Sequence, residues 1–296
     1  MSGYELTLEA TREVSRVRHQ LALGLSFVDS VSAQAVIGSL LCSLEQIGST
    51  DFSVLFQPHR RDRMALRFEG AIKKQMDKLI KAGLPAAWTL RAFGTLNPAA
   101  AQYQAQLDPH VYVPRRLNMD LVLAAGVPAS STANMRTPWL WPGPAYPFAA
   151  TSTLVRGRVM RGASLSSAVP LPWARLFATV PSTETVFSQA QIVGCGHGDG
   201  RGEFVLALDA KASTGAALKN PVPVRLWAFV PPAGPNLHPD DPLAQLPVEV
   251  CGTAVDSSVL RGLAVPPGYS VQQSRNLALR LGETLSGSSA EFLFAP

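Results

Sequence analysis

The most reactive residue types in this sequence gather in a glycine-rich stretch around Cys195. Cys195 and His197 are two residues apart, so on a β-strand both side chains point to one face, where a metal could take both. A closed zinc site needs four ligands, and the only plausible additions, Cys251 and His238, lack a paired spacing such as C-x-x-C. We therefore predict no metal site. Cys195 is expected to be a small buried side chain, with His197 and Asp199 at the exposed end of a hairpin.

The same glycines do not match a phosphate-binding loop. Asp199 stands where the third glycine of G-x-G-x-x-G, counted from Gly194, would fall, and neither a helical pattern nor a P-loop lysine follows. A Ser-His-Asp hydrolase is disfavoured because the chain has no G-x-S-x-G elbow and no alternation of strands with helices. We predict that the chain is not an enzyme and that it has no catalytic residues and no cofactor.

Composition predicts a folded chain in a reduced compartment. Of the 296 residues, 47% are hydrophobic and 16% are charged, which argues against disorder. The apolar stretch 121–127 is too short to span a bilayer, and Glu5, Glu9 and Glu13 stand where a signal peptide would be cationic and apolar. Three cysteines, an odd number, argue against a disulfide framework. We expect a cytoplasmic protein without a membrane span, retained there or released as part of a particle.

The net charge of +5 comes from 26 basic and 21 acidic residues and gathers in one cluster. The basic side chains of that cluster are Arg60, Arg61, Arg63, Arg67, Lys73, Lys74, Lys78 and Lys81. Asp62, Glu69 and Asp77 interrupt the cluster, and it lacks the interleaved aromatic residues that stack on single-stranded bases. A solvated or subunit-facing surface is therefore predicted, and nucleic acid is not expected as a partner.

Periodicity predicts one helix among many short strands. Apolar residues at i, i+4, i+7 and i+8 predict a helix over 70–82, which Gly83 and Pro85 end. The expected strands are 21–27, 40–44, 52–56, 90–93, 154–160, 173–180, 191–195, 204–208, 222–230, 277–281 and 292–294. The turn residues between them have spacings typical of antiparallel sandwiches.

A stretch rich in proline and aromatic residues, 126–152, separates the two halves. Its large rings favour a protein surface over solvent: Trp139, Trp141, Tyr146 and Phe148. Two interpretations remain open. Trp139 and Trp141 pack on their own domains, or the four rings form a strip that docks another subunit, since aromatic residues are enriched in interface cores. We predict these four residues as the partner-binding site.

The two halves show a short internal repeat in the same order along the chain. The matched segments are 21–27 with 154–159, 40–44 with 173–177, 61–68 with 200–208, 88–93 with 224–229 and 116–121 with 276–281. Similarity in this order predicts tandem β-sandwiches, although amphipathic strands also resemble one another by chance.

The second half carries a more specific pattern. Its segments read VRGRV at 155–159, VPLPWARL at 169–176 and DGRGEFVL at 199–206. They resemble the carboxypeptidase-regulatory-like, transthyretin-type β-sandwich, whose pattern is V-x-G-x-V, P-x-x-x-A-x-V and D-x-x-G-x-F, over residues 153–232. Gly157 permits close sheet-to-sheet approach, and the Asp-Gly-Arg-Gly turn supplies positive φ before Phe204 enters the core.

The resemblance implies an accessory module. Peptidases that carry such a domain have a zinc domain with a His-x-x-Glu pair, and no histidine here has glutamate three residues later. Chains of these modules are similar to accessory subunits of phage-tail-like particles, including contractile injection systems. The implied role is a cap, baseplate or fibre-associated subunit.

We therefore predict a mainly β protein of two tandem antiparallel β-sandwich domains, Ig-like or transthyretin-like. Domain one spans 1–125 and carries the short helix, 126–152 is the linker, and domain two spans 153–296. The predicted function is a non-enzymatic structural or adaptor subunit of a multi-protein particle, in a homo- or hetero-oligomer. The alternative is a glycan- or cell-surface-binding β-sandwich module.

Overall fold

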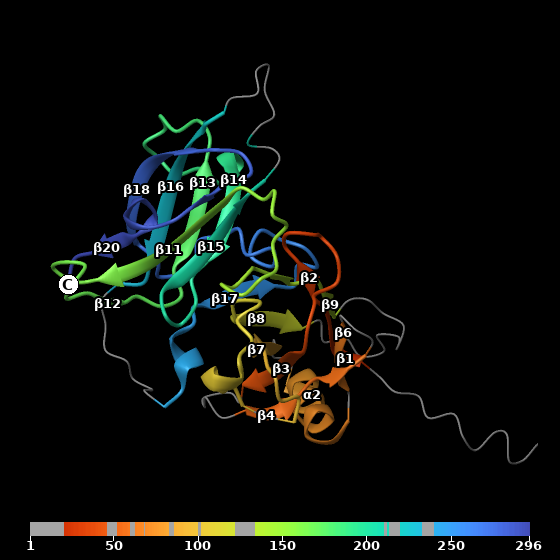
Figure 1. Cartoon of the computed structure of the whole chain (residues 1–296). Helices are drawn as coiled ribbons and strands as arrows, with labels where there is room; N and C mark the ends of the chain where they lie inside the picture. Colours follow the sequence, from red (N-terminus) through yellow and green to blue (C-terminus); the bar gives the residue numbers. More distant parts are fainter. Residues whose placement is uncertain are drawn as a thin grey trace, which may run out of the picture.

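The computed structural model describes residues 21–45, 52–59, 63–67, 69–82, 86–99, 102–121, 134–209, 212, 220–232 and 240–296. These residues form several β-sheets and, within the described ranges, one α-helix. Two groups of strands lie one above the other in Figure 1. The predicted mainly β class is confirmed. No helix in the described part of the chain is long and apolar enough to cross a membrane.

Two sheets enclose the core of the first half. The five-stranded sheet has the order β17 (Val248–Gly252), β8 (Arg115–Leu121), β7 (Ala86–Gly94), β3 (Leu40–Glu45), β4 (Phe52–Leu55). The four-stranded sheet has the order β5 (Gln57–Pro58), β6 (Arg63–Arg67), β1 (Leu21–Ser26), β9 (Met135–Arg136). A short parallel pair joins β10 (Trp139–Leu140) to β2 (Val28–Asp29). Strict alternation of buried and half-buried residues along β8 shows that one face of this strand points into the core.

The predicted helix over 70–82 is confirmed as α2 (Gly70–Ala82). Ile72 and Met76 are buried in the core of the first half, and Leu79 packs against it. Lys73 and Lys74 are exposed on the opposite side, as the amphipathic pattern requires.

One curled sheet of nine strands forms the second half. Its main path is β12 (Val169–Pro170), β11 (Leu154–Arg161), β15 (Glu203–Leu208), β14 (Ile192–His197), β13 (Arg175–Thr179), β16 (Val222–Val230), β18 (Val271–Leu279). Two short strands, β19 (Thr284–Leu285) and β20 (Phe292–Phe294), pair with β11 in parallel. The curl brings β18 beside β20 (Figure 1), where Gln273 Nε2 donates to the Leu293 carbonyl at 2.8 Å.

The strand pairings of the first half recur in the second, in the order that the sequence repeat predicts. β1 pairs with β6 as β11 pairs with β15, both antiparallel. The antiparallel series β4-β3-β7-β8 corresponds to β14-β13-β16-β18. β9 joins β1 in parallel, as β19 and β20 join β11. Amphipathic strands resembling one another by chance would not reproduce these partners, so the pairings support the repeat.

The connection between β16 and β18 leaves its own half. It carries β17, which pairs in parallel with β8 at the edge of the first half's sheet. In the part of the chain that the structure describes, four short 3-10 turns lie among the connections: η1 (Ala105–Leu107), η2 (Gln189–Gln191), η4 (Pro242–Gln245) and η5 (Ser288–Ala290). The two halves therefore share a sheet, while the sequence boundaries placed at 125 and 153 stay predictions.

Two residues of the second-half pattern take the expected positions, whereas Gly157 lies against a turn and not against a second sheet. Gly202 adopts φ +72° in the turn between β14 and β15, and Phe204 is buried two residues later. A Cβ atom on Gly157 would clash with the backbone oxygen of Ala290. Glycine at 157 thus lets β11 lie against the η5 turn.

We predict that Gly157→Ala destabilises the fold, because the clash is with backbone that a rotamer change cannot relieve. The free energy of unfolding, measured by urea denaturation, should fall by about 1–3 kcal/mol. Arg158→Ala is the control on the same strand. This change removes a solvent-accessible pair with Glu291 and should alter stability by less than about 1 kcal/mol. Equal stability of Gly157→Ala and the parent would contradict the close approach.

Candidate functional site

The structure places Cys195 and His197 on one face of β14, as their spacing predicts. The Sγ of Cys195 lies 3.7 Å and the Nε2 of His197 lies 3.0 Å from the same acceptor, the carbonyl oxygen of Gly262. Cys195 is buried, as predicted. The prediction that His197 and Asp199 lie at an exposed hairpin end is wrong, because both are buried. The connection that carries Gly262 covers His197, and Asp199 is turned into its own hairpin, where it binds Arg201 and Glu203.

The environment of His197 favours a neutral imidazole. Burial lowers the pKa of His197 well below its ordinary value, and the nearby charges of Arg175 and Arg115 lower it further. The ring lies 5.4 Å from that of Trp141, and Nδ1 has no hydrogen-bond partner among the described residues. Burial also raises the pKa of Cys195, so the thiol stays protonated. No group of three or more metal-ligating side chains occurs in the part of the chain that the structure describes.

The four aromatic residues predicted as a docking strip make contacts within the chain. Trp141 is buried, and its Nε1 donates to the Arg261 carbonyl at 2.8 Å. Tyr146 is buried as well, whereas Trp139 and Phe148 are half-buried. Arg261 lies over the Trp139 ring, 5.3 Å from its centre. The packing interpretation therefore holds for Trp141, and the partner-binding role of the four residues stays a prediction.

A buried aspartate anchors this aromatic segment to the first half. Asp29 Oδ2 accepts hydrogen bonds from the hydroxyls of Tyr112 and Tyr146, both at 2.7 Å. Its Oδ1 accepts from the backbone N–H groups of Val31 and Ser32. The carboxylate is thus fully engaged and fixes both tyrosine rings.

A buried ion triplet of Arg115, Glu249 and Arg175 joins the two halves, and we call it the brace. All three side chains are at most 1% exposed. Arg115 holds Glu249 with two hydrogen bonds, Nε to Oε1 at 3.0 Å and Nη2 to Oε2 at 2.7 Å. Arg175 Nη2 adds a third bond to Oε1 at 3.1 Å. Because Arg115 lies on β8, Glu249 on β17 and Arg175 on β13, the brace ties the sheets of both halves together.

Arg115 also holds three backbone carbonyls. Its Nη1 donates to Trp139 at 2.8 Å and to Leu260 at 2.6 Å, and its Nη2 donates to Val259 at 2.6 Å. One guanidinium therefore positions the aromatic segment and the β17–β18 connection at once. Arginine suits this role because its five N–H donors have a fixed planar geometry.

A second charged group lies next to the brace in the same sheet. Glu45 on β3 binds Arg91 on β7 and Arg116 on β8, the latter through two bonds of 2.7 Å. Arg91 Nη1 reaches both carboxylate oxygens of Asp241 at 2.7 and 2.8 Å. Asp241 begins the η4 turn, so this group fastens the second half's long connection to the first half's sheet.

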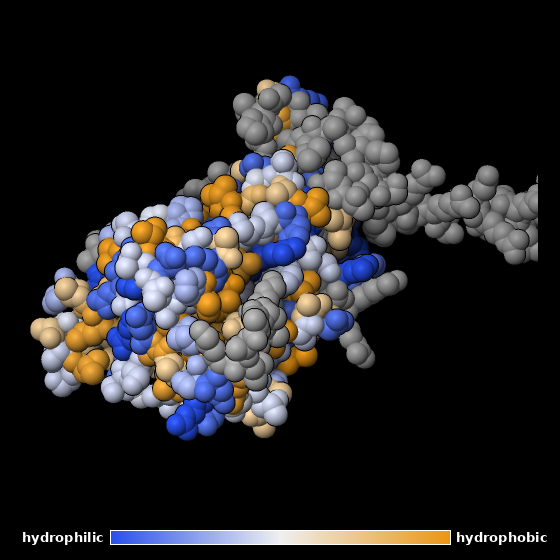
Figure 2. Space-filling view, turned by 90° about the horizontal axis from the view of Figure 1, so that it is seen from above, coloured by the Kyte–Doolittle hydropathy of each residue, from blue (hydrophilic) through white to orange (hydrophobic). Residues whose placement is uncertain are grey.

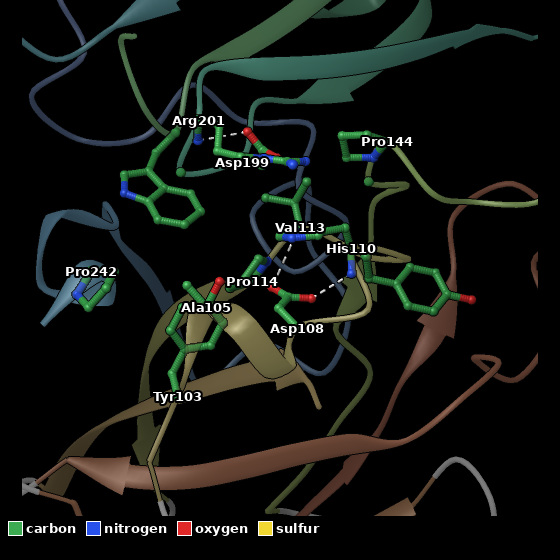
Figure 3. A pocket seen from close by; sticks show the side chains of 14 residues that line it. Tyr103, Ala105, Asp108, His110, Val113, Pro114, Pro144, Asp199, Arg201 and Pro242 are labelled. Carbon is green, nitrogen blue, oxygen red and sulfur yellow. Dashed lines mark hydrogen bonds and ion pairs between the residues drawn. The ribbon is translucent and has the colours of Figure 1, made fainter. Parts of the chain in front are cut away.

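A pocket of about 200 Å³ opens where the two halves meet (Figure 3), and we call it the junction pocket. Residues on the β7–β8 connection form one side: Tyr103, Ala105, Asp108, His110, Tyr112, Val113 and Pro114. The β14–β15 hairpin forms the opposite side with Asp199, Gly200 and Arg201. The remaining lining residues come from other connections: Gly143, Pro144, Trp173 and Pro242. His110 and Trp173 both adopt positive φ, 53° and 63°, which is uncommon for these residue types.

Asp108 is the most deeply placed charged group of the pocket, with its side chain 2% exposed. Its Oδ2 accepts from the Tyr103 hydroxyl at 2.9 Å, and its Oδ1 accepts from the His110 backbone N–H at 2.7 Å. Burial raises the pKa of Asp108, these hydrogen bonds lower it, and the neighbouring Asp199 charge raises it. The balance leaves the pKa above its ordinary value, so the carboxylate lacks full compensation.

Asp199 plays a structural part across the pocket. Its Oδ1 accepts from the backbone N–H groups of Arg201 and Glu203, which shapes the hairpin turn. Its Oδ2 accepts from Nε and Nη2 of Arg201 at 3.0 and 2.9 Å, and Figure 3 shows the two side chains together. The arrangement offers a preformed recess with aromatic and proline walls and charged groups at two ends, which is suited to binding a small group.

Sequence reasoning missed the brace and the junction pocket. Arg175 begins a strand whose other residues are largely apolar, and a charged residue in that position is a signal for a buried ion pair. Arg115 begins a strand in which polar and apolar residues alternate, so the sequence gives no such signal for it. Their partner Glu249 lies in a segment that we did not predict as a strand. The pocket residues lie on connections, where strand periodicity carries no information.

No protein-family model and no curated protein matches the chain. Among solved structures, the TIE protein of Bacillus anthracis aligns at TM-score 0.24 and 8% identity, covering 94% of this chain and 34% of that chain. The minor pilin of Streptococcus agalactiae aligns at TM-score 0.23 and 8% identity, covering 92% and 95% of the two chains. For the shaft pilin of Lactobacillus rhamnosus GG, the TM-score is 0.24, the identity 10% and the coverage 94% and 98%. This chain spans about a third of the TIE protein's length. At these TM-scores the likenesses carry no argument about function.

Removing the carboxylate of the brace should be costly. Glu249→Gln leaves Arg115 and Arg175 buried without a counter-charge, and we expect the free energy of unfolding to fall by about 3–5 kcal/mol. Glu283→Gln breaks an exposed pair with Arg280 and should change stability by less than about 1 kcal/mol. Urea denaturation of both variants measures the difference. Comparable small losses in both would show that the brace does not stabilise the fold.

The brace also predicts an acid-sensitive stability. Burial raises the pKa of Glu249, but the charges and hydrogen bonds of Arg115 and Arg175 outweigh it, so the net pKa lies below the ordinary value of 4.5. Because the pKa is lower in the folded state, the stabilisation is present above pH 4.5 and is lost as the pH falls through the folded pKa. Urea denaturation between pH 7 and pH 3 should show this loss in the parent. The loss should be smaller in Glu249→Gln, and identical pH profiles would contradict the assignment.

Proposed function

We propose that this chain is a non-enzymatic structural or adaptor subunit of a larger protein assembly. The brace is the observation that carries the proposal. It fixes two β repeats in one orientation through charges that are buried on both sides of the junction. A subunit that holds neighbouring chains at set positions needs such a fixed body, and a buried ion pair with exact partners specifies orientation more strictly than apolar packing does.

Surface features support attachment to other chains without naming them. Large hydrophobic side chains are exposed at several places: Val31, Ile37, Leu96, Leu165, Val169, Val186, Val250, Val255 and Val271. On the face seen in Figure 2, hydrophobic residues lie in small groups among hydrophilic ones. Trp139 with Arg261 above its ring combines the two residue types that are most enriched in interface cores.

The sequence resemblance supplies a narrower proposal. On that basis the assembly is a phage-tail-like contractile particle, with this chain at its cap, baseplate or fibres. The support is the transthyretin-type pattern of 153–232 alone. The direct test is fractionation of source cells by sedimentation followed by mass spectrometry of the heavy fractions. The chain should sediment in constant ratio with tube, sheath or baseplate proteins, and a chain found only as a free monomer would overturn the assembly proposal.

Trp139→Ala tests the predicted docking strip of Trp139, Trp141, Tyr146 and Phe148 at one of its two half-buried residues. We expect less of this variant in the heavy fraction, by at least about tenfold, because a tryptophan at an interface centre contributes about 2 kcal/mol or more. Thr185→Ala removes an exposed polar side chain elsewhere and should sediment as the parent does. Melting temperatures of the purified variants separate lost docking from lost stability. Unchanged incorporation of Trp139→Ala would contradict the predicted strip.

A further inference from the structure

The junction pocket holds a net negative charge. Asp108 and Asp199 each bring one carboxylate, and Arg201 brings one guanidinium. That guanidinium is already engaged, because its Nη2 lies 2.9 Å from Asp199 Oδ2 and 3.1 Å from Glu203 Oε2. The carboxylates among the lining residues therefore outnumber the guanidinium by one.

The uncompensated charge lies on Asp108. Among the described residues, the one ion-pair contact of its carboxylate is His110 Nδ1, at 3.8 Å, which is charged only when the imidazole is protonated. The two hydrogen bonds to this carboxylate come from neutral donors, the Tyr103 hydroxyl and a backbone N–H. A buried carboxylate with neutral partners gains more from an incoming cation than an exposed one does, because water screens it less.

The walls of the pocket suit the apolar body of such a cation. Tyr103 and Trp173 present aromatic rings, and Pro114, Pro144 and Pro242 add apolar surface. Aromatic rings attract alkylammonium and guanidinium groups through their negative faces. The side chains in Figure 3 come from connections of both halves, so the site exists only when the halves are joined.

We propose that the junction pocket binds an organic cation, an alkylammonium or guanidinium group, with its charge beside Asp108 and its apolar part against Tyr103 and Trp173. The inference goes beyond the structural role proposed above. Charge complementarity decides against an anion, because the one arginine of the pocket is engaged by Asp199 and Glu203. The cation comes from a free amine or from a lysine or arginine side chain of another protein.

The test is an NMR titration of the full chain, followed through backbone amides and tryptophan indoles. The probes are n-butylammonium, n-butylguanidinium, N-acetyl-lysine methylamide, N-acetyl-arginine methylamide and the neutral N-acetyl-norleucine methylamide. The cationic probes should shift the signals of His110, Trp173 and Gly200 and should bind at least about tenfold more tightly than the neutral probe. Tighter binding of the simple cations indicates a free amine, and tighter binding of the amino-acid probes indicates a partner's side chain.

Two variants with opposite expected effects keep the test decisive. Asp108→Asn should weaken cation binding by at least about tenfold, because it removes the uncompensated charge but keeps an oxygen that accepts from the His110 N–H. Arg201→Gln should tighten it by about threefold, because it removes the competing positive charge from an exposed side chain. Asp256→Asn deletes an exposed carboxylate paired with Arg261 and serves as the matched control, with unchanged affinity.

The outcomes decide the proposal whichever way they fall. Equal binding of cationic and neutral probes, parent-like affinity of Asp108→Asn, or no shift with any probe would overturn it. The sedimentation experiment tests the structural role and does not depend on the cation site. A negative NMR titration would therefore not contradict the structural role, and a negative sedimentation result would not contradict the cation site.

Discussion

The buried bond between Glu249 and its two arginines is the interaction on which the other features of the junction depend. Three charged side chains leave water together, so their desolvation must be offset by near-ideal geometry. The bidentate contact of Arg115 and the added bond from Arg175 supply it. Loss of Glu249 would leave two buried arginines without a counter-charge, and loss of either arginine would remove bonds that offset the desolvation of Glu249. The brace therefore makes the orientation of the two repeats an all-or-none property of the fold.

The brace exists because one connection of the repeat leaves its own half. The β16–β18 segment carries Glu249 to the first half's sheet, and its next turns cover β14 with Gly262. These turns explain why His197 is buried. Strand spacing correctly predicted that His197 shares a face with Cys195, but it did not predict that another segment covers this face. The same crossing brings the β7–β8 connection beside the β14–β15 hairpin and so creates the junction pocket. The two halves contain similar sets of paired strands, and the long connections join them.

The buried carboxylates of this molecule differ in how many hydrogen bonds they receive, and this difference separates structural carboxylates from one that is free to bind a ligand. Glu249 and Asp29 each receive several hydrogen bonds from fixed partners, which is what a structural carboxylate requires. Asp108 receives two from neutral donors beside an opening. Satisfaction of hydrogen bonds thus distinguishes a carboxylate that holds the fold together from one that has capacity left for a ligand.

The sequence alone was enough to predict the helix at Gly70–Ala82, many of the longer strands, the repeat and the glycines at 157 and 202. Those follow from periodicity and backbone sterics, which act between near neighbours. It could not place Glu249 against Arg115, bury His197 or join Asp108 to Asp199. These contacts link residues from about 65 to more than 130 positions apart, and their partners are chosen by where the long connections run. Tertiary structure decided them because desolvation depends on which segment finally covers a side chain, and local sequence does not record that.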